Sequence, residues 1–231
     1  MLTKIVENLI NIIDIFHQNR IVKYFMKQTI DIVIDVGAHK GEYLKKIRKI
    51  KPSKIYAFEP QKKIFQQLKV NTKIFKEVKI FNYACNDKDI KQTFFINSLT
   101  STSSLLKPNE NNWWIKFKKF ILQKNSLIET MEVIKTKTLD SIIFKELDPY
   151  SKILIKIDTE GNELNVLKGS KKILQKRNVS FIQVEVAKNE IYESNNSEKL
   201  EAFLNKQGYF KCKSFLYPML NFSDDIYRKK G

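Results

Sequence analysis

The chain has 231 residues, with 42 Lys and Arg against 25 Asp and Glu, which gives a formal net charge of +17. This length suits one α/β domain better than two, so we expect a single domain over residues 1–231. The two cysteines, Cys85 and Cys212, exclude a disulfide framework and a cysteine zinc site, which favours a reducing, cytoplasmic setting.

The first predicted element is an amphipathic helix over residues 3–28. Its apolar side chains recur near helical spacing: Ile5, Leu9, Ile12, Ile13, Phe16, Ile21 and Phe25. The opposite face carries Glu7 and Asp14 as well as lysine, so we expect the apolar stripe to pack on the core rather than on a membrane. Asn11 and Asp14 also interrupt the apolar run that a signal peptide would need.

Short strands and helices then alternate along the chain. We expect strands over residues 30–37, 53–60 and 78–86, and helices over residues 42–50 and 62–75. Strand, helix and strand at such short intervals are typical of a parallel sheet with helices on its faces.

The second half of the chain adds a hairpin and then continues the alternation. Residues 91–97 and 131–138 predict two strands of an inserted hairpin or sheet edge, with the polar segment 97–127 between them. The remaining expected elements are a helix over 139–147, a strand over 152–158, a helix over 162–177, a strand over 179–186, a helix over 197–208 and a strand or strand pair over 209–217.

The segment VIDVGAHKGEY, residues 33–43, joins a buried strand to a helix through a loop with two glycines. Gly37 and Gly41 let the backbone approach a ligand at the carboxyl end of the first strand, although a strand-to-helix turn alone could also need glycine. The segment lacks the G-x-G-x-x-G of dinucleotide sites and the Lys-Ser/Thr ending of a phosphate loop. A cofactor without phosphates is therefore favoured.

Polar residues end the neighbouring strands at the same edge of the predicted sheet. Asp35 ends the first strand, and Glu59 ends the second, 18 residues after Gly41. An acid about 20 residues beyond the glycines is placed to accept hydrogen bonds from ribose hydroxyls. Asn86 and Asp87 end the third strand, where this fold borders an adenine ring and where a plain polar turn is equally expected.

The segment ILIKIDTEGNEL, residues 153–164, brings Asp158 and Glu160 to that same edge. Acids in the first turn of a helix can cap it and oppose its dipole, which is one use for Glu160. Glu163 can meet that need, and Asp158 precedes the helix. We therefore expect Asp158 to point into the crevice at the end of the sheet.

Four segments resemble the FkbM-type family of S-adenosylmethionine-dependent methyltransferases: VIDVGAHKGEY, YAFEP, TKTLDSI and LIKIDTEGNELNVLKGS. The last is the most specific, and the similarity covers residues 31–187. The resemblance implies an α/β, Rossmann-like class I methyltransferase fold, with a mostly parallel seven-stranded sheet, helices on both faces and an antiparallel C-terminal edge. It also implies methyl transfer to a hydroxyl of a sugar, glycan or glycosylated small molecule. Within this single domain, residues 1–28 would be a helical extension and residues 97–127 an acceptor-side insertion or lid.

The resemblance also implies which residues contact the cofactor. They are Asp35, Gly37, Ala38 and Gly41 at the methionine end, Glu59 at the ribose hydroxyls, and Asn86 or Asp87 near adenine. His39 departs from the family, which commonly has Asn or another small polar residue there. We expect His39 to contact the cofactor rather than to act as a base or lie on the surface.

Methyl transfer is an in-line displacement at carbon, so the protein must align donor and acceptor and remove the acceptor's proton. A carboxylate within hydrogen-bond reach can take that proton, which contributes about 10²–10⁴-fold to the rate. We expect Asp158 to be this base, with Glu160 second and Glu185 third; Glu185 equally suits a polar strand end. Paired acids could instead hold a divalent metal, but the sequence shows no clear cluster to complete its shell.

One helical face in the segment 97–127 is aromatic: Trp113, Trp114, Phe117, Phe120 and Ile121. It could form a lid, stack on a sugar, or make a peripheral contact with a membrane-bound glycolipid, and packing on the sheet is the use we expect.

The charge of +17 leaves an RNA methyltransferase as an alternative. The lysines are scattered, however, as an A/T-rich coding bias would scatter them, and no N-P-P-Y or D-P-P-Y run is present to grip a flipped base. A catalytically silent module would be expected to lose the acids at 59 or 158, which this chain keeps. A sugar, glycan or small molecule is therefore the expected partner, and the sequence leaves the oligomeric state undetermined.

Overall fold

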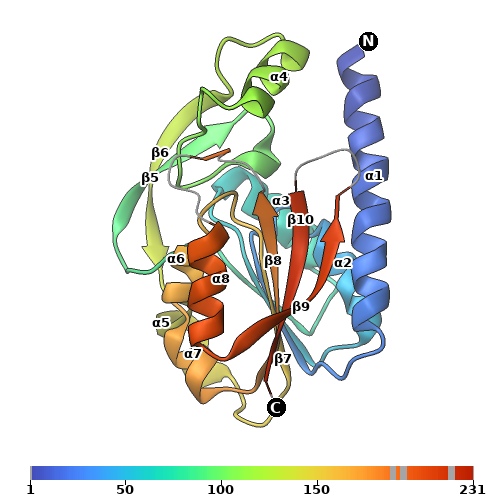
Figure 1. Ribbon diagram of the computed structural model, residues 1–231, viewed down its shortest axis with the longest axis vertical. Helices are drawn as coiled ribbons and strands as arrows, with labels where there is room; N and C mark the ends of the chain where they lie inside the picture. Colours follow the sequence, from blue (N-terminus) through green and yellow to red (C-terminus); the bar gives the residue numbers. More distant parts are fainter. Residues whose placement is uncertain (1, 188–190, 193–196, 218–221, 231) are drawn as a thin grey trace.

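A computed structural model describes the backbone of residues 2–187, 191–192, 197–217 and 222–230, and side chains from Ile12 onward. Its centre is a seven-stranded sheet with the order β3-β2-β1-β7-β8-β10-β9, of which β8, β10 and β9 lie side by side in Figure 1. The strands are β1 Ile32–Val36, β2 Lys54–Phe58, β3 Val78–Phe81, β7 Ile153–Ile157, β8 Val179–Ala187, β9 Tyr209–Leu216 and β10 Phe222–Lys229. β10 runs in the opposite direction to the other six strands of this sheet and so pairs antiparallel with both β8 and β9. This confirms the expected class I methyltransferase fold.

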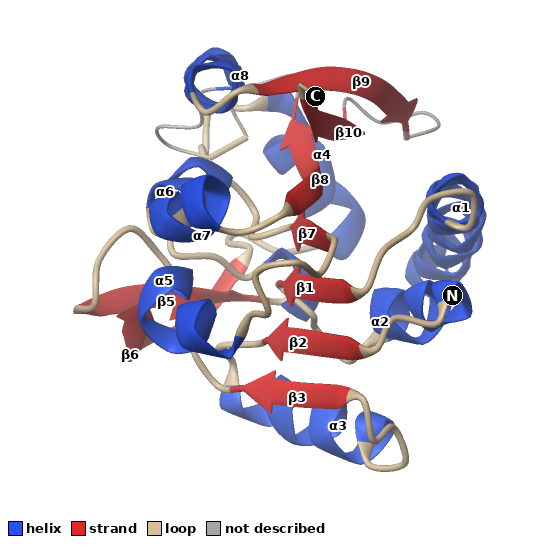
Figure 2. Cartoon of the chain, turned by 90° about the horizontal axis from the view of Figure 1, so that it is seen from below, coloured by secondary structure: helices blue, strands red, loops and turns tan. Residues whose placement is uncertain are grey.

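Helices cover both faces of this sheet (Figure 2). On one face lie α1 Leu2–Phe25, α2 Glu42–Ile47 and α3 Lys62–Thr72; on the other lie α5 Leu139–Ile143, α6 Glu163–Lys168, α7 Lys171–Lys176 and α8 Ser197–Lys206. Short 3-10 turns follow at Arg48–Ile50, Thr100–Thr102 and Phe144–Glu146. Every residue of β1 and β7 is buried, because both faces of the central strands are covered. This explains why these strands are continuous apolar runs.

A second, three-stranded sheet lies beside the first and has the order β4-β6-β5. It consists of β4 Ala84–Cys85, β5 Lys91–Asn97 and β6 Ile128–Lys137, and α4 Trp113–Leu122 lies between β5 and β6 in the chain. The single strand predicted over residues 78–86 was wrong, because the chain leaves the main sheet after Phe81. There the side-chain amide of Asn82 donates to the carbonyl oxygens of Glu59 and Pro60, both at 2.9 Å.

The single helix predicted over residues 162–177 is also wrong, since α6 and α7 are separated at Gly169 and Ser170. A Cβ atom at Gly169 would lie 2.0 Å from the carbonyl oxygen of Asn86, so this position is fixed against the loop after β4. The carboxylate of Asp140 then accepts from the backbone N–H groups of Lys172 and Ile173, both at 2.9 Å, and starts α7 anew.

Two apolar surfaces differ from the expectation that they pack on the core. On α1, Ile21 and Phe25 are buried, but Ile12 and Phe16 are each 63% exposed, and Ile5 and Leu9 lie outside the described side chains. On α4, Ile115 is the only buried residue; Trp113, Phe117 and Phe120 are exposed. None of the helices within the described ranges is long and apolar enough to span a membrane.

Candidate active site

The loop after β1 meets the loop after β7 at the carboxyl edge of the sheet. Gly37 and Gly41 both have left-handed backbones, with φ of 84° and 87°. A Cβ atom at Gly37 would lie 1.8 Å from the carbonyl oxygen of Asp158, so no larger residue fits there. Glycine is thus required by this contact between two loops, whatever it also contributes to ligand binding.

Glu59 is buried at the end of β2 and faces the same loop. Its carboxylate accepts from the backbone N–H of His39 at 3.0 Å and from that of Gln61 at 2.8 Å. Burial raises the pKa of this carboxyl to about 7, although the two N–H groups oppose the shift. The ring of His39 extends away to Thr100, with Nε2 3.0 Å from the hydroxyl oxygen, and so connects the loop to the segment 97–127.

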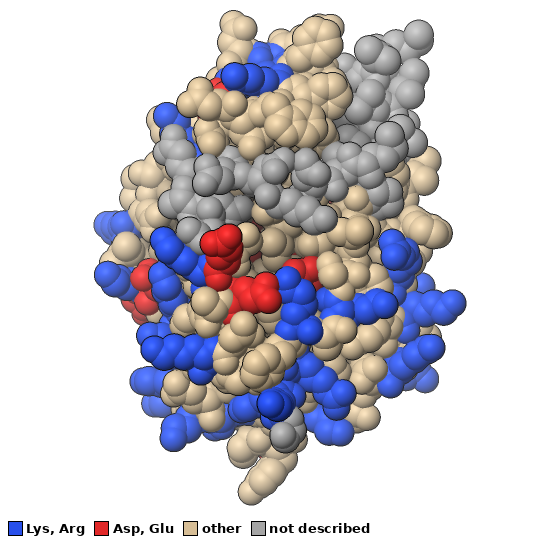
Figure 3. All heavy atoms as spheres, in the orientation of Figure 1, with Lys and Arg blue, Asp and Glu red and all other residues tan. Residues whose placement is uncertain are grey.

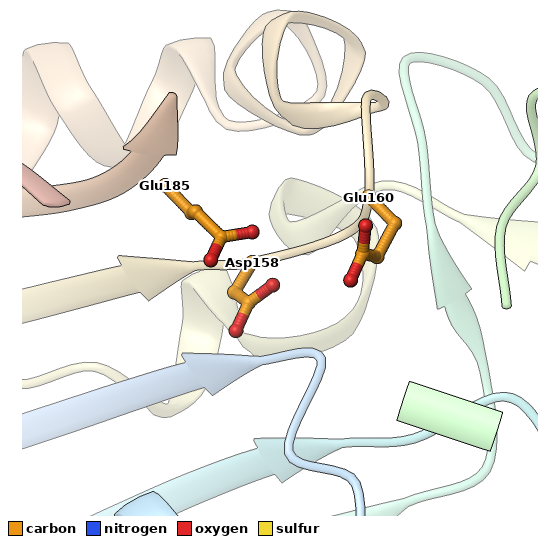
Figure 4. A group of neighbouring side chains, drawn as sticks. All are labelled: Asp158, Glu160 and Glu185. Atoms are coloured by element: carbon orange, nitrogen blue, oxygen red, sulfur yellow. The ribbon is translucent and has the colours of Figure 1, made fainter. Parts of the chain in front are cut away.

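Asp158, Glu160 and Glu185 form a carboxylate group at the ends of β7 and β8 (Figure 4). One oxygen from each lies within 4.8 Å of the others, and all three side chains are half-buried. Asp158 and Glu185 point toward one another, and Glu160 enters from the loop that follows β7. Sequence reasoning named all three separately, and the structure brings them together. Acidic side chains gather near the middle of the face in Figure 3, and many Lys and Arg side chains lie among other residues in its lower half.

Lys156 neutralises part of this charge, a role that sequence reasoning missed. Its ammonium lies 3.1 Å from Asp158 and 3.4 Å from Asp35, and it donates to the carbonyl oxygen of Gly37 at 3.2 Å. Burial alone would lower the pKa of Lys156, but Asp158 and Asp35 hold it well above its ordinary value. A lone cation in the apolar strand ILIKI was the available signal, because a buried lysine needs a partner.

Glu160 lies in a different setting from Asp158. The hydroxyl of Tyr192 donates to its carboxylate, and burial raises its pKa to about 7 while Lys118 of α4 opposes that shift. Gly161 allows this arrangement, because a Cβ there would lie 2.8 Å from the Tyr192 ring. Glu160 itself has a left-handed backbone, with φ of 54°, which is unusual for a residue with a side chain.

The carboxylates of this group also shift the pKa values of Glu185 and Lys118. Burial, followed by Asp158 and Glu160, raises the pKa of Glu185 well above its ordinary value. Burial lowers the pKa of Lys118, although Glu160 and Glu185 oppose the change. The positive charge of Lys118 on α4 therefore acts on the carboxylate group, an influence that the sequence did not reveal.

Glu163 serves the start of α6, as expected. One of its carboxylate oxygens accepts from the backbone N–H groups of Thr159 and Gly161, at 3.0 and 2.9 Å. The start of α6 therefore does not need Asp158 or Glu160 as a cap. Carboxylate oxygens are the ligands that Mg²⁺ and Ca²⁺ prefer, so Asp158, Glu160 and Glu185 could hold a divalent ion.

Comparison of the fold with solved structures finds methyltransferases. The magnesium protoporphyrin IX methyltransferase of Synechocystis PCC 6803, with bound SAH, is 7% identical, with a TM-score of 0.55 over 97% of this chain and 87% of that one. A weaker match is precorrin-6y C5,15-methyltransferase from Geobacter metallireducens, which is 11% identical, with a TM-score of 0.49 over 92% of this chain and 87% of that one. Another is a putative RNA methyltransferase from Pyrococcus horikoshii, which is 9% identical, with a TM-score of 0.47 over 91% of this chain and 81% of that one. At these identities the likeness shows the fold alone.

The sequence itself decides the family, because the model of the methyltransferase FkbM domain matches residues 35–211. The chain belongs to the FkbM methyltransferase family. No protein of curated function matches the sequence. As an FkbM methyltransferase it uses S-adenosylmethionine as its methyl donor.

The buried polar atoms of this FkbM chain suit that cofactor. Both carboxylate oxygens of Asp35, the side-chain carbonyl of Gln61 and that of Asn86 are buried and accept no hydrogen bond from the described residues. All are acceptors; Asp35 lies in the last part of β1, Gln61 follows β2 and Asn86 follows β4. S-adenosylmethionine offers donors of three kinds, an ammonium, ribose hydroxyls and an adenine amino group, so the cofactor fits this edge. Asp87, beside Asn86, is half-buried.

Proposed function

We propose that this FkbM methyltransferase methylates a hydroxyl of a sugar, a glycan or a glycosylated small molecule. The observation that supports this most strongly is the carboxylate group of Asp158, Glu160 and Glu185 next to the proposed cofactor loop. A hydroxyl is a poor nucleophile at neutral pH until a base takes its proton. Three convergent carboxylates suit that task, and they would repel the phosphates of an RNA acceptor.

Within the group, we assign the base to Glu160 and a positioning role to Asp158. Lys156 contacts Asp158 at 3.1 Å and offsets its charge, whereas a carboxyl with a pKa of about 7 is matched to accept a proton near neutral pH. This departs from the order expected from the sequence, in which Asp158 came first. Glu185 would then share protons with its two neighbours and hold the acceptor by hydrogen bonds.

Bound S-adenosylmethionine supplies an electrophilic methyl group on a sulfonium. The bond from sulfur to that methyl carbon is the one that transfer would break, with its electron pair left on sulfur. The protein's own contribution is to align the acceptor oxygen in line with that bond and to move its proton to the Glu160 carboxylate. The segment 97–127, through α4, would cover the acceptor and exclude water.

The test compares Glu160→Gln, Asp158→Asn and the exposed control Glu132→Gln. Turnover would be measured with extracted surface polysaccharides and their nucleotide-sugar precursors, and binding of S-adenosylhomocysteine by calorimetry. We expect Glu160→Gln to lower kcat by about 10²–10⁴-fold, with cofactor affinity changed much less. The wild-type rate should rise with pH through about 7, and the variant should lose that rise.

Three outcomes would revise the proposal. A Glu160→Gln enzyme with near-normal kcat would remove Glu160 as the base, and a larger loss in Asp158→Asn would return that role to Asp158. Loss of activity in EDTA with recovery in Mg²⁺ would assign the carboxylates to a divalent ion that lowers the hydroxyl pKa. Methylation of RNA but of no carbohydrate acceptor would overturn the acceptor class.

A further inference from the structure

A chain of buried hydrogen bonds joins α1 to the helix that follows the glycine loop. His17 of α1 has Nε2 2.7 Å from the carboxylate of Asp224 on β10. The other oxygen of Asp224 accepts from the side-chain amide of Gln183 on β8, also at 2.7 Å. The Gln183 carbonyl in turn accepts from the hydroxyl of Tyr43 on α2 at 2.6 Å.

The side chains of His17, Gln183 and Tyr43 are buried and that of Asp224 is 13% exposed, and the hydrogen bonds satisfy both oxygens of Asp224. The exposed fraction is 1% for His17, 2% for Gln183 and 9% for Asp224 as whole residues. Because the Asp224 carboxylate can only accept, the His17 proton is assigned to Nε2 and every bond in the chain donates toward Asp224. Removing one donor would leave a buried acceptor without a hydrogen bond, and the other three side chains would have to shift to reduce that cost.

The far end of this chain lies at the site. Tyr43 follows Gly41 by two residues, and its ring lies 5.4 Å from the ammonium of Lys156. Lys156 contacts both Asp35 and Asp158. The polar connection therefore runs from α1 to the residues that face the cofactor, through four elements of the fold.

Both ends of the His17–Asp224 contact lie outside residues 35–211, the part that matches the family. We propose that His17 is a positioning residue, through which α1 and β10 hold Tyr43 and Lys156 in the arrangement that binds S-adenosylmethionine. The N-terminal helix is then a working part of the methyltransferase and not only an extension. This inference rests on the family's cofactor and is independent of the proposed acceptor.

The experiment measures S-adenosylhomocysteine affinity by calorimetry without any acceptor. His17→Leu removes the donor, and His17→Gln keeps an N–H at a similar reach. We expect His17→Leu to weaken binding by about threefold to thirtyfold and His17→Gln to restore it to within about twofold of wild type. Tyr43→Phe should weaken binding similarly, and His17→Leu should add little in the Tyr43→Phe background because the connection is already broken.

Ile21→Ala is the matched control, because Ile21 is fully buried on the same helix and forms no part of the polar chain. It should lower thermal stability yet leave cofactor affinity within about twofold of wild type. Equal loss of affinity in Ile21→Ala and His17→Leu would mean that His17 acts only through its packing, like Ile21, and would overturn the inference. If His17→Leu does not fold, Tyr43→Phe decides alone, and unchanged affinity in that variant overturns the inference.

Discussion

Glu59 and Lys156 show how single side chains set the charge of this site. Both are buried at the carboxyl edge of the sheet, yet one has a pKa near neutrality and the other stays charged. The difference lies in their partners, since Lys156 contacts two carboxylates while Glu59 accepts only backbone N–H groups. Burial thus shifts the pKa of each group toward its neutral form, and two adjacent carboxylates reverse that shift only for Lys156.

If Glu59 holds the ribose hydroxyls, as the sequence predicts, its pKa makes cofactor binding depend on pH. An ionised carboxylate accepts ribose hydroxyls better than a neutral carboxyl, so bound cofactor favours the ionised form. With a pKa of about 7, we expect S-adenosylhomocysteine affinity to rise about tenfold from pH 6 to pH 8. Calorimetry at several pH values between 6 and 8 measures this change in affinity.

Glu59→Gln is the control for this effect, because glutamine keeps the size of the side chain and cannot ionise. Its affinity should be lower than that of the wild type at pH 8 and constant over the same range. An unchanged slope in this variant would place the titrating group elsewhere.

At the scale of elements, most of the fold follows from the sequence. Buried strands such as Ile32–Val36 and Ile153–Ile157 are apolar over their whole length, and glycine marks their loops. Two of the errors, the strand over 78–86 and the helix over 162–177, have a common physical origin. The chain bends at Asn82 and at Gly169 because of contacts with segments distant in sequence, and no local pattern predicts such contacts.

Gly169 provides a prediction about such a contact. A methyl group there would meet the carbonyl oxygen of Asn86, so Gly169→Ala should lower the free energy of unfolding by about 1–3 kcal/mol. It should also weaken S-adenosylhomocysteine binding, since Asn86 would shift. Urea unfolding and calorimetry measure the two effects.

Gly208 is the matched comparison. It has a left-handed backbone, with φ of 82°, and no atom within 4 Å of an added Cβ. Gly208→Ala should therefore cost about 1–2 kcal/mol of stability through backbone strain and leave binding unchanged. Weaker binding in Gly208→Ala as well would mean that lost stability, and not the shift of Asn86, lowers the affinity.

At the scale of the whole molecule, the site was partly predictable. Asp35, Glu59 and Asp158 could be placed at one edge because parallel strands end together. Lys118 and Tyr192 could not, because they lie in segments whose position relative to the sheet depends on tertiary packing. His17 and Asp224 are 207 residues apart, and neither carries a motif.

The raised pKa values also predict how overall stability changes with pH. Glu59 and Glu160 titrate at about 7 in the folded protein, against an ordinary value of 4.5. Between these values the folded state binds more protons than the unfolded state, so stability falls as pH rises. The destabilising contribution is absent below about pH 4.5 and complete above about pH 7.

We therefore expect the cofactor-free protein to lose on the order of 5 kcal/mol of unfolding free energy between pH 5 and pH 8, about half of it from each carboxyl. Urea unfolding at both values measures the loss. Glu160→Gln should reduce it, and stability that increases over this interval would contradict the assigned ionisation.

The strand order β8-β10-β9 has a consequence for how the protein is made. β9 precedes β10 in the chain but reaches the main sheet only through β10, which lies between β8 and β9. During synthesis, β9 must wait without a partner in this sheet until residues 222–229 have left the ribosome. Asp224 arrives at the same moment, so the contact between His17 and Asp224 can form only when β10 is inserted.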